Sequence, residues 1–239
     1  MAFLPEDRIL VASTRATDLS CVEVPDSIAR GPALAVFKLH AVPLTGHQQV
    51  TQLPVSMFAL ELGRDIVPFD MQLHYRPNTH SYSPDVVVPF FSSQADHIIA
   101  LETTNHLRLS DDTLGLVLPL RHIIIIPIAK LLHHVRTAEK KGTCCFVQWD
   151  DWGATGISRL PALRPSQCCN AVSGSRFIPH PQSCDVIGVW DFSRAQARVS
   201  QHHISVSKEV ALPAGISSSG VATAALSEDA IVLHEASIV

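Results

Sequence analysis

Apolar residues in this chain come in short runs separated by proline, glycine, serine and aspartate. The runs have the length of β-strands and are rich in β-branched and aromatic residues, a composition that favours strands. Sixteen prolines lie between and within them, and proline limits helix length because it lacks the backbone N–H. The runs expected to form strands span residues 9–12, 19–24, 33–39, 85–91, 97–102, 122–126, 144–149 and 186–192. The pattern predicts a mainly β, or all-β, protein.

One segment has the periodicity of a helix. Its apolar positions follow the i, i+3, i+4, i+7 spacing of a single helical face: Ile128, Leu131, Leu132 and Val135. Lys140 and Lys141 fall where the helix dipole favours cations, and Gly142 can close the end. One short helix near residues 129–141 is therefore expected.

A faint repeat runs along the chain. An acidic residue just before an apolar pair recurs at Asp7, Asp96, Asp185 and Asp229, with spacings of 89, 89 and 44 residues. The two longer spacings are twice the shorter one within a residue. A unit of about 44 residues has the size of a four-stranded propeller blade.

Two Trp-Asp pairs fit the same architecture. Trp149-Asp150 and Trp190-Asp191 are 41 residues apart and each follows an apolar run, where propeller repeats place this dipeptide. A small sheet cannot bury both of its faces alone, so blades stack radially and share their cores. The expected fold is a partial or irregular β-propeller-like stack of antiparallel sheets, forming a single domain over residues 1–239.

Charge and composition limit the classes of partner that are expected. The chain is 46% hydrophobic and 17% charged, with a formal net charge of −4. Acidic and basic residues are spread along it, so no positive field gathers phosphates and nucleic acid is not an expected partner. A surface this poor in charge favours a protein partner, whose identity the sequence leaves open.

The chain carries no sign of secretion or of membrane insertion. Residues 1–10 contain Glu6 and Asp7 and no long apolar region, so they do not form a secretory signal. The apolar stretch at 114–132 is broken by two prolines and three basic or imidazole side chains, whereas a membrane span needs about 20 mostly apolar residues. The six cysteines, which include two adjacent pairs, are read as reduced thiols. A cytoplasmic or nuclear location is expected.

No motif for catalysis or cofactor binding is present. Residues 215–220 are one residue too long for a nucleophile elbow, and neither a phosphate-binding loop nor a dinucleotide fingerprint occurs. His133 and His134 are adjacent and so point to different faces of a helix, which argues against a shared metal ion. We therefore expect no catalytic residue, no metal site and no cofactor.

The segment Trp149-Asp-Asp-Trp152 could be read as paired carboxylates for acid–base chemistry. Neighbours on a strand point to opposite sides, however, and such a pair needs both carboxyls facing one gap. A turn after a buried strand is the preferred interpretation, with Trp149 in the core and Gly153 adopting a positive φ.

Three motifs resemble the C-terminal halves of F-box proteins from mushroom-forming fungi. Residues 147–153, followed by Arg159, are similar to that family's Val-Pro-Trp-x-x-Trp-Gly-Pro segment and its later Thr-Arg, although Gln148 replaces the first proline. Residues 174–177 are similar to its Gly-x-Arg-Phe, and residues 189–193 to its aliphatic-x-Asp-Phe-Asn-Pro. The residues that carry the resemblance are Trp149, Asp151, Trp152, Gly153, Arg159, Gly174, Arg176, Phe177, Trp190, Asp191 and Phe192.

The resemblance implies a non-catalytic module that recruits protein substrates for a cullin-RING ubiquitin ligase. No F-box is found here, although one could lie upstream of Met1, so docking on the ligase lacks its usual element. Two alternatives stay open. One is an unrelated WD40-like propeller scaffold. The other is an enzyme with an unrecognised site, for which the candidate cluster is Asp70, His74, Asp96, His97 and Glu102.

Overall fold

The protein is represented by a computed structural model. It describes residues 1–19, 24, 31–39, 54–61, 66–75, 96–107, 119–153, 158–163, 171–178, 186–192, 206–211, 221–226 and 231–235. Two compact units are built from segments that alternate along the chain. The first comprises Met1–Leu73, Leu101–Ile124 and Lys130–Arg164, and the second comprises His74–Ala100, Ile125–Ala129 and Pro165–Val239. The single domain expected from the sequence stays a prediction.

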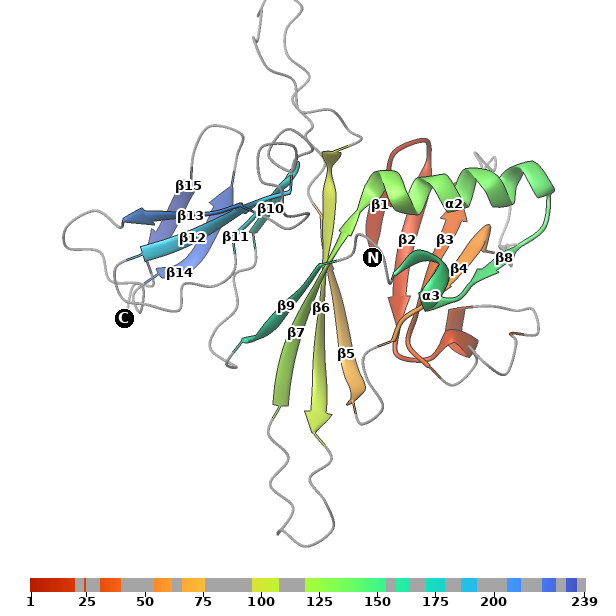
Figure 1. Ribbon diagram of the computed structural model, residues 1–239, viewed down its shortest axis with the longest axis horizontal. Helices are drawn as coiled ribbons and strands as arrows, with labels where there is room; N and C mark the ends of the chain where they lie inside the picture. The colour runs from red at the N-terminus through yellow and green to blue at the C-terminus, as the bar shows by residue number, and fades with distance from the viewer. Residues whose placement is uncertain are drawn as a thin grey trace, which may run out of the picture. The chain divides into compact units, whose positions relative to one another are not determined.

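A five-stranded sheet in the order β1-β2-β3-β4-β8 forms the centre of the first unit (Figure 1). Its strands are β1 (Ala2–Leu4), β2 (Arg8–Ser13), β3 (Ala33–Lys38), β4 (Ser56–Ala59) and β8 (Cys145–Val147). The first four strands pair antiparallel in chain order, whereas β8 joins β4 in parallel. This parallel edge requires a long crossover, which includes the helix α2 (Ile128–Lys141).

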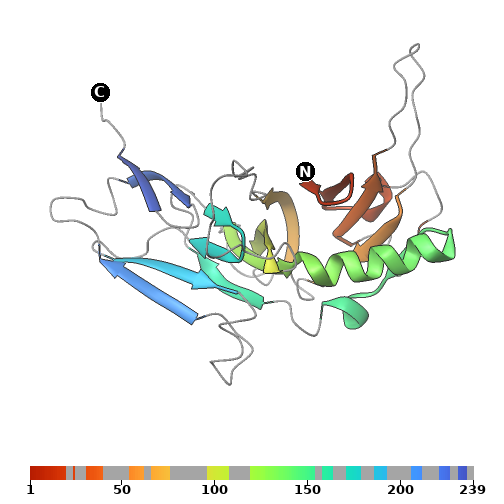
Figure 2. The ribbon, with the colours of Figure 1, turned by 90° about the horizontal axis from the view of Figure 1, so that it is seen from above.

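Helix α2 lies along one face of this sheet, as two views at right angles show (Figures 1 and 2). Strand alternation turns Leu10, Leu34, Val36 and Phe58 to one side, and all four are fully buried. The helix contributes its own buried face: Leu131, Leu132, Val135 and Ala138. Each large apolar side chain enclosed here stabilises the fold by about 1.5–3 kcal/mol.

The opposite face of the sheet is covered near one end by a short 3₁₀ helix, η1 (Ala16–Leu19). Ala16 and Leu19 form a core cluster with Ala33, Ala35 and Met57. The small side chains on β3 let η1 approach the sheet closely. Where η1 reaches the sheet, the strands are therefore the middle of three layers, with α2 on one face and η1 on the other.

Three further sheets make up the remaining described strands. One has the order β5-β6-β7-β9, one has the order β10-β11-β12-β13, and the third is a β14-β15 hairpin. The bounds are β5 (Ile66–His74), β6 (Ile98–Leu107), β7 (Pro119–Pro127), β9 (Ser158–Leu163), β10 (Ala171–Ser173), β11 (Arg176–Ile178), β12 (Val186–Asp191), β13 (Val206–Ala211), β14 (Val221–Leu226) and β15 (Ile231–Glu235).

The chain is mainly β, as the hydrophobic pattern predicts. Strands β2, β3, β6, β7, β8 and β12 lie within or overlap six of the expected runs. The other two expected strands fall mostly or wholly outside the described residues: Leu19 ends η1, while residues 20–23 and 85–91 are not described.

The predicted helix is confirmed, beginning at Ile128 and ending at Lys141. Gly142 has a φ of +68°, and its N–H donates to the carbonyl oxygens of Ala138 and Glu139 at 3.1 Å. Glycine adopts this left-handed conformation without steric cost, so it ends the helix as expected.

The sheets β5-β6-β7-β9 and β10-β11-β12-β13 have the strand number of a propeller blade. The parallel pairing of β4 with β8 departs from the expected antiparallel pattern. The apolar pairs after the four recurring acidic residues lie in β2, β6, β12 and β15. A radial arrangement of the sheets stays a prediction.

Candidate functional site

The first motif segment forms a single helical turn, α3 (Trp149–Trp152), directly after β8. Trp152 is fully buried, with its ring centroid 5.0 Å from that of Phe58. Its indole Nε1–H donates to the carbonyl oxygen of Ala59 at 2.8 Å. Trp152 therefore anchors α3 to the sheet through both apolar contact and a hydrogen bond.

Two details of the predicted turn are wrong. Trp149 is only half-buried, and Trp152 takes the core position instead. Gly153 has a φ of −92°, which is right-handed. The reason for glycine here is space, because a Cβ atom would come within 2.3 Å of the Trp149 ring. The Gly153 N–H also donates to the Trp149 carbonyl at 2.6 Å.

The two carboxylates of this motif do not form a catalytic pair. Asp150 and Asp151 are both exposed and lie on consecutive positions of α3. Consecutive residues on a helix point about 100° apart, so the carboxyl groups do not face one gap. The Trp149-Asp150 pair consequently opens a helix and does not end a strand, contrary to the propeller expectation.

The second and third motifs meet in the sheet β10-β11-β12-β13. Gly174 adopts a φ of +57° in the turn between β10 and β11, which glycine permits. Asp191, at the end of β12, accepts a hydrogen bond from Ser175 Oγ at 2.9 Å and pairs with Arg176 at 3.7 Å. Asp191 thus holds the turn against the neighbouring strand.

The aromatic residues of the second and third motifs also join β11 and its preceding turn to β12. Phe177 is fully buried and lies opposite Trp190 in the β11–β12 register. The Phe192 N–H donates to the Ser175 carbonyl at 2.8 Å. The Trp190-Asp191 pair does end a strand, as expected. Phe177, Trp190 and Phe192 therefore have structural roles within this sheet.

The motif residues fall into two groups. Residues 149–153 belong to the first unit and residues 174–192 to the second. Arg159 lies in β9, and its side chain is outside the description. The structure brings the second and third motifs together and leaves the first in the other unit.

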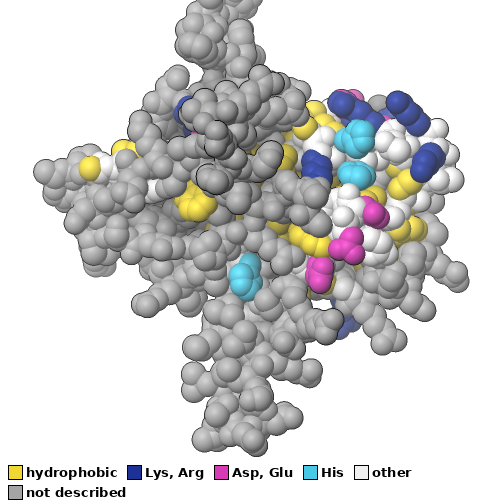
Figure 3. Space-filling view, viewed as in Figure 1, with side chains coloured by type: hydrophobic (Ala, Val, Ile, Leu, Met, Phe, Trp, Pro, Cys, Tyr) yellow, Lys and Arg dark blue, Asp and Glu magenta, His cyan; other side chains and the backbone are white. Residues whose placement is uncertain are grey.

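A surface that the sequence analysis overlooked lies on the outer side of α2 (Figure 3). We call it the basic stripe; its residues are Lys130, His133, His134, Thr137, Lys140 and Lys141. They recur every three or four residues, opposite the buried face. The signal is present in the sequence, because these positions recur at helical spacing and contain no acidic residue. The sequence analysis considers Lys140 and Lys141 as cations of the last turn and His133 and His134 as metal ligands, but not the six residues as one surface.

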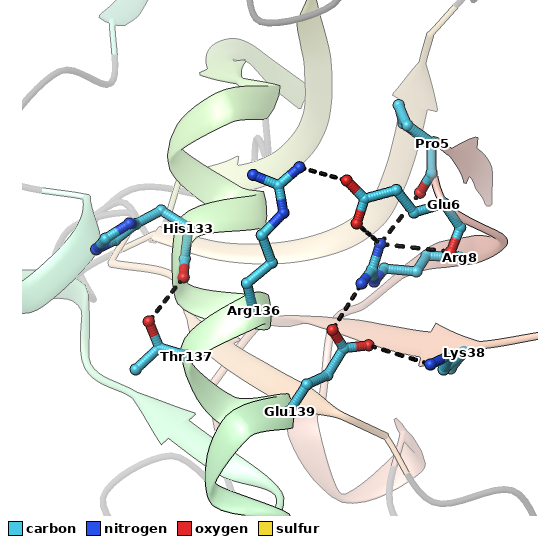
Figure 4. A network of polar contacts seen from close by, with 8 residues as sticks. All are labelled: Pro5, Glu6, Arg8, Lys38, His133, Arg136, Thr137 and Glu139. Carbon is cyan, nitrogen blue, oxygen red and sulfur yellow. Dashed lines mark hydrogen bonds and ion pairs between the residues drawn. The ribbon is translucent and has the colours of Figure 1, made fainter.

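An ion-pair network lies beside this stripe and ties α2 to the sheet (Figure 4). Arg8, with 4% of its side chain exposed, pairs with Glu6 and with Glu139, the latter at 2.6 Å. Arg136 also pairs with Glu6, and Lys38 lies 4.0 Å from Glu139. The network joins the β1–β2 turn, β3 and the helix.

The network also sets the ionisation of its members. Hydrogen bonds from Arg136 and Arg8 lower the pKa of Glu6 to about 2. Burial acts to lower the pKa of Arg8, but its hydrogen bonds to Glu139 and Glu6 outweigh burial and raise it. Glu6 and Arg8 are therefore charged at neutral pH.

Burial lowers the pKa of two side chains in the basic stripe, Lys130 and His134. The positive charges of His133 and Lys130 lower the pKa of His134 further.

Cys144 and Cys145 are half-buried free thiols, and burial raises the pKa of Cys144. The Cys144 thiol is accordingly in its less reactive, protonated form.

The residues proposed for the enzyme alternative have partners of their own. Glu102 pairs with Arg121 at 3.2 Å, and Asp70 accepts a hydrogen bond from Gln72 at 2.8 Å. Over the part of the chain that the structure describes, no three His, Cys, Asp or Glu side chains are placed to hold a metal ion. No helix in the same part is both long and apolar enough to cross a membrane.

No family model, no curated protein and no solved structure matches this chain.

Proposed function

We propose that this chain is a non-catalytic protein-interaction module of the kind found in the substrate-recruiting region of F-box ubiquitin-ligase adaptors. The proposal starts from the resemblance of residues 147–153, 174–177 and 189–193 to that family. Its partner is a protein, and it needs neither a cofactor nor a metal ion.

The observation that carries the proposal is that three of the motif side chains, one aromatic residue in each unit and one carboxylate, hold the fold together. Trp152 and Phe177 are fully buried, and Asp191 pairs with Ser175 and Arg176. Side chains held in this way support a scaffold. Recognition then falls to exposed surfaces, which differ between proteins that share a scaffold.

The WD40-like alternative is less well supported. It expects Trp-Asp pairs at the ends of equivalent strands, and Trp190-Asp191 meets this expectation. Trp149-Asp150 lies in α3. Among the described residues a regular Trp-Asp repeat is therefore missing.

A capture experiment tests the proposal. The tagged chain is cross-linked in an extract of a mushroom-forming fungus, captured proteins are identified by mass spectrometry, and each is purified for titration calorimetry. We expect at least one saturable complex of fixed stoichiometry. Joining an F-box to the chain should direct ubiquitylation of that protein, whereas the chain alone should not associate with the cullin-RING ligase.

Two variants make the result specific. Replacing the exposed carboxylates, as in Asp150→Asn with Asp151→Asn, should leave binding intact, because the proposal gives them no chemical role. Trp152→Ala should abolish binding by disturbing the fold. The proposal fails if no protein binds saturably, or if the chain turns over a substrate and the double variant loses that activity.

A further inference from the structure

A series of ring contacts joins α2, β4 and α3 within the first unit. The His134 ring on α2 lies edge-on to Phe58 of β4, with ring centroids 6.1 Å apart and an interplanar angle of 80°. Phe58 in turn contacts Trp152 of α3 at 5.0 Å. His134 is therefore the titratable side chain through which α2 meets the apolar anchor of α3.

The surroundings of this contact are apolar. Phe58 and Trp152 are both fully buried, and His134, which packs against Phe58, is partly buried itself. A neutral imidazole packs against an aromatic ring at little cost, whereas an imidazolium in the same place loses part of its hydration. Burial therefore favours the neutral form of His134.

Charged and titratable groups face His134 from two elements. On α2 itself, the His133 ring centroid lies 5.6 Å from that of His134, and Lys130 precedes His134 by four residues, about one helical turn. On α3, Asp151 is exposed and acts on His134 electrostatically. The contact on β4, Phe58, carries no charge. A proton on His134 is therefore opposed by its neighbours on α2 and favoured by the carboxylate on α3.

The balance of these effects sets the sign of the pH dependence. Burial, His133 and Lys130 together lower the pKa of His134 below its ordinary value of 6.5, and Asp151 offsets only part of this. The unfolded chain therefore binds the proton more tightly than the folded chain does. The contribution of neutral His134 to stability is fully present above pH 6.5 and is lost as the pH falls through the folded pKa.

We propose that the contact between His134 and Phe58 is an acid-sensitive switch, which holds α2 against β4 and α3 while the imidazole is neutral and loosens when it is protonated. Trp152 stays attached to β4 through its hydrogen bond to the Ala59 carbonyl at 2.8 Å. The expected change is therefore a local opening around α3 and not an unfolding of the sheet. The switch needs no partner, so it goes beyond the proposed function and does not depend on it.

The test uses the full chain and two measurements. Nuclear magnetic resonance follows the titration of each imidazole, and amide hydrogen exchange gives the protection factors of residues 149–153 at about pH 7.5 and about pH 5.5, on either side of the range in which histidine titrates. His134 should titrate below pH 6.5, and protection at Trp152 should fall at the lower pH. Asp151→Asn should lower the midpoint of His134 further, because it removes the carboxylate that favours the proton.

Two glutamine variants separate His134 from its neighbour. His134→Gln cannot take up a proton, so protection at Trp152 should no longer depend on pH. His133→Gln is the matched control, since His133 is adjacent on the same helix but exposed. It should retain the loss of protection at the lower pH, and it should raise the midpoint of His134 because one opposing charge is gone. Circular dichroism at the higher pH checks that both variants are folded.

Three results would overturn the inference. A His134 midpoint at or above pH 6.5 would show that the attraction of Asp151, or of the Phe58 ring for a cation, prevails over burial. Protection at Trp152 that is the same at both pH values would show that the contact does not open. An equal loss of protection in His134→Gln would assign the opening to another group. If His134→Gln does not fold, the midpoint of His134 and the protection at Trp152 in the unaltered chain still decide the first two outcomes.

Discussion

Replacing Trp152 with alanine should destabilise the protein severely. The side chain is fully buried against Phe58, and its indole N–H satisfies the Ala59 carbonyl at 2.8 Å. Truncating a buried tryptophan costs about 3–5 kcal/mol. In a chain of this size each kcal/mol lowers Tm by about 2–4 °C, so a loss of about 4 kcal/mol should lower Tm by about 8–16 °C.

Two companion variants separate the contributions. Trp152→Phe keeps most of the apolar volume but leaves the Ala59 carbonyl without its donor, and should cost about 1–2 kcal/mol. Trp149→Ala removes a half-buried ring and should cost less than Trp152→Ala. The assay is urea denaturation followed by circular dichroism, with the free energies of unfolding compared at equal slope.

The free energies of unfolding of Trp149→Ala and Trp152→Ala show which of the two tryptophans anchors α3. If Trp149→Ala destabilises the chain as much as Trp152→Ala, the sequence-based placement of Trp149 in the core is correct and the assignment of Trp152 as the anchor of α3 is refuted. An equal effect of Trp152→Phe and Trp152→Ala would show that the hydrogen bond dominates over packing.

Three further substitutions test separate features. Gly153→Ala should destabilise the chain by about 1–3 kcal/mol in urea melts because its Cβ would displace the Trp149 ring; unchanged stability would contradict this. The Glu6 carboxylate has a pKa of about 2, below its ordinary value of 4.5, so its contribution is present above pH 4.5 and is lost as the pH falls towards 2. Glu6→Gln should therefore lower stability at pH 7 by about 1 kcal/mol, allowing for solvent screening, and the difference should vanish at pH 2. Asp191→Asn should weaken the hold on the turn containing Ser175 and increase its amide hydrogen exchange, whereas equal exchange would exclude this role.

Local sequence patterns predict the strands that are continuous apolar runs. Strands β2, β3, β7 and β12 are predicted because apolar residues, many of them β-branched or aromatic, form short runs there. Strands such as β5, which contains Pro68, and β9, which contains Pro161, were missed because proline and polar residues interrupt them. Pairing with neighbouring strands overrides these weak local preferences.

The sequence by itself determined the mainly β character, the helix and its end at Gly142, since these depend on periodicity and on backbone preferences within a few residues. The basic stripe can also be found from the sequence, because its residues recur every three or four positions along one helix. Only the tertiary structure decided that Trp152 and not Trp149 is enclosed, that β8 pairs in parallel with β4, and that Glu139 meets Arg8, 131 residues away. These outcomes depend on which distant surfaces come together to exclude water, and no local pattern specifies that choice.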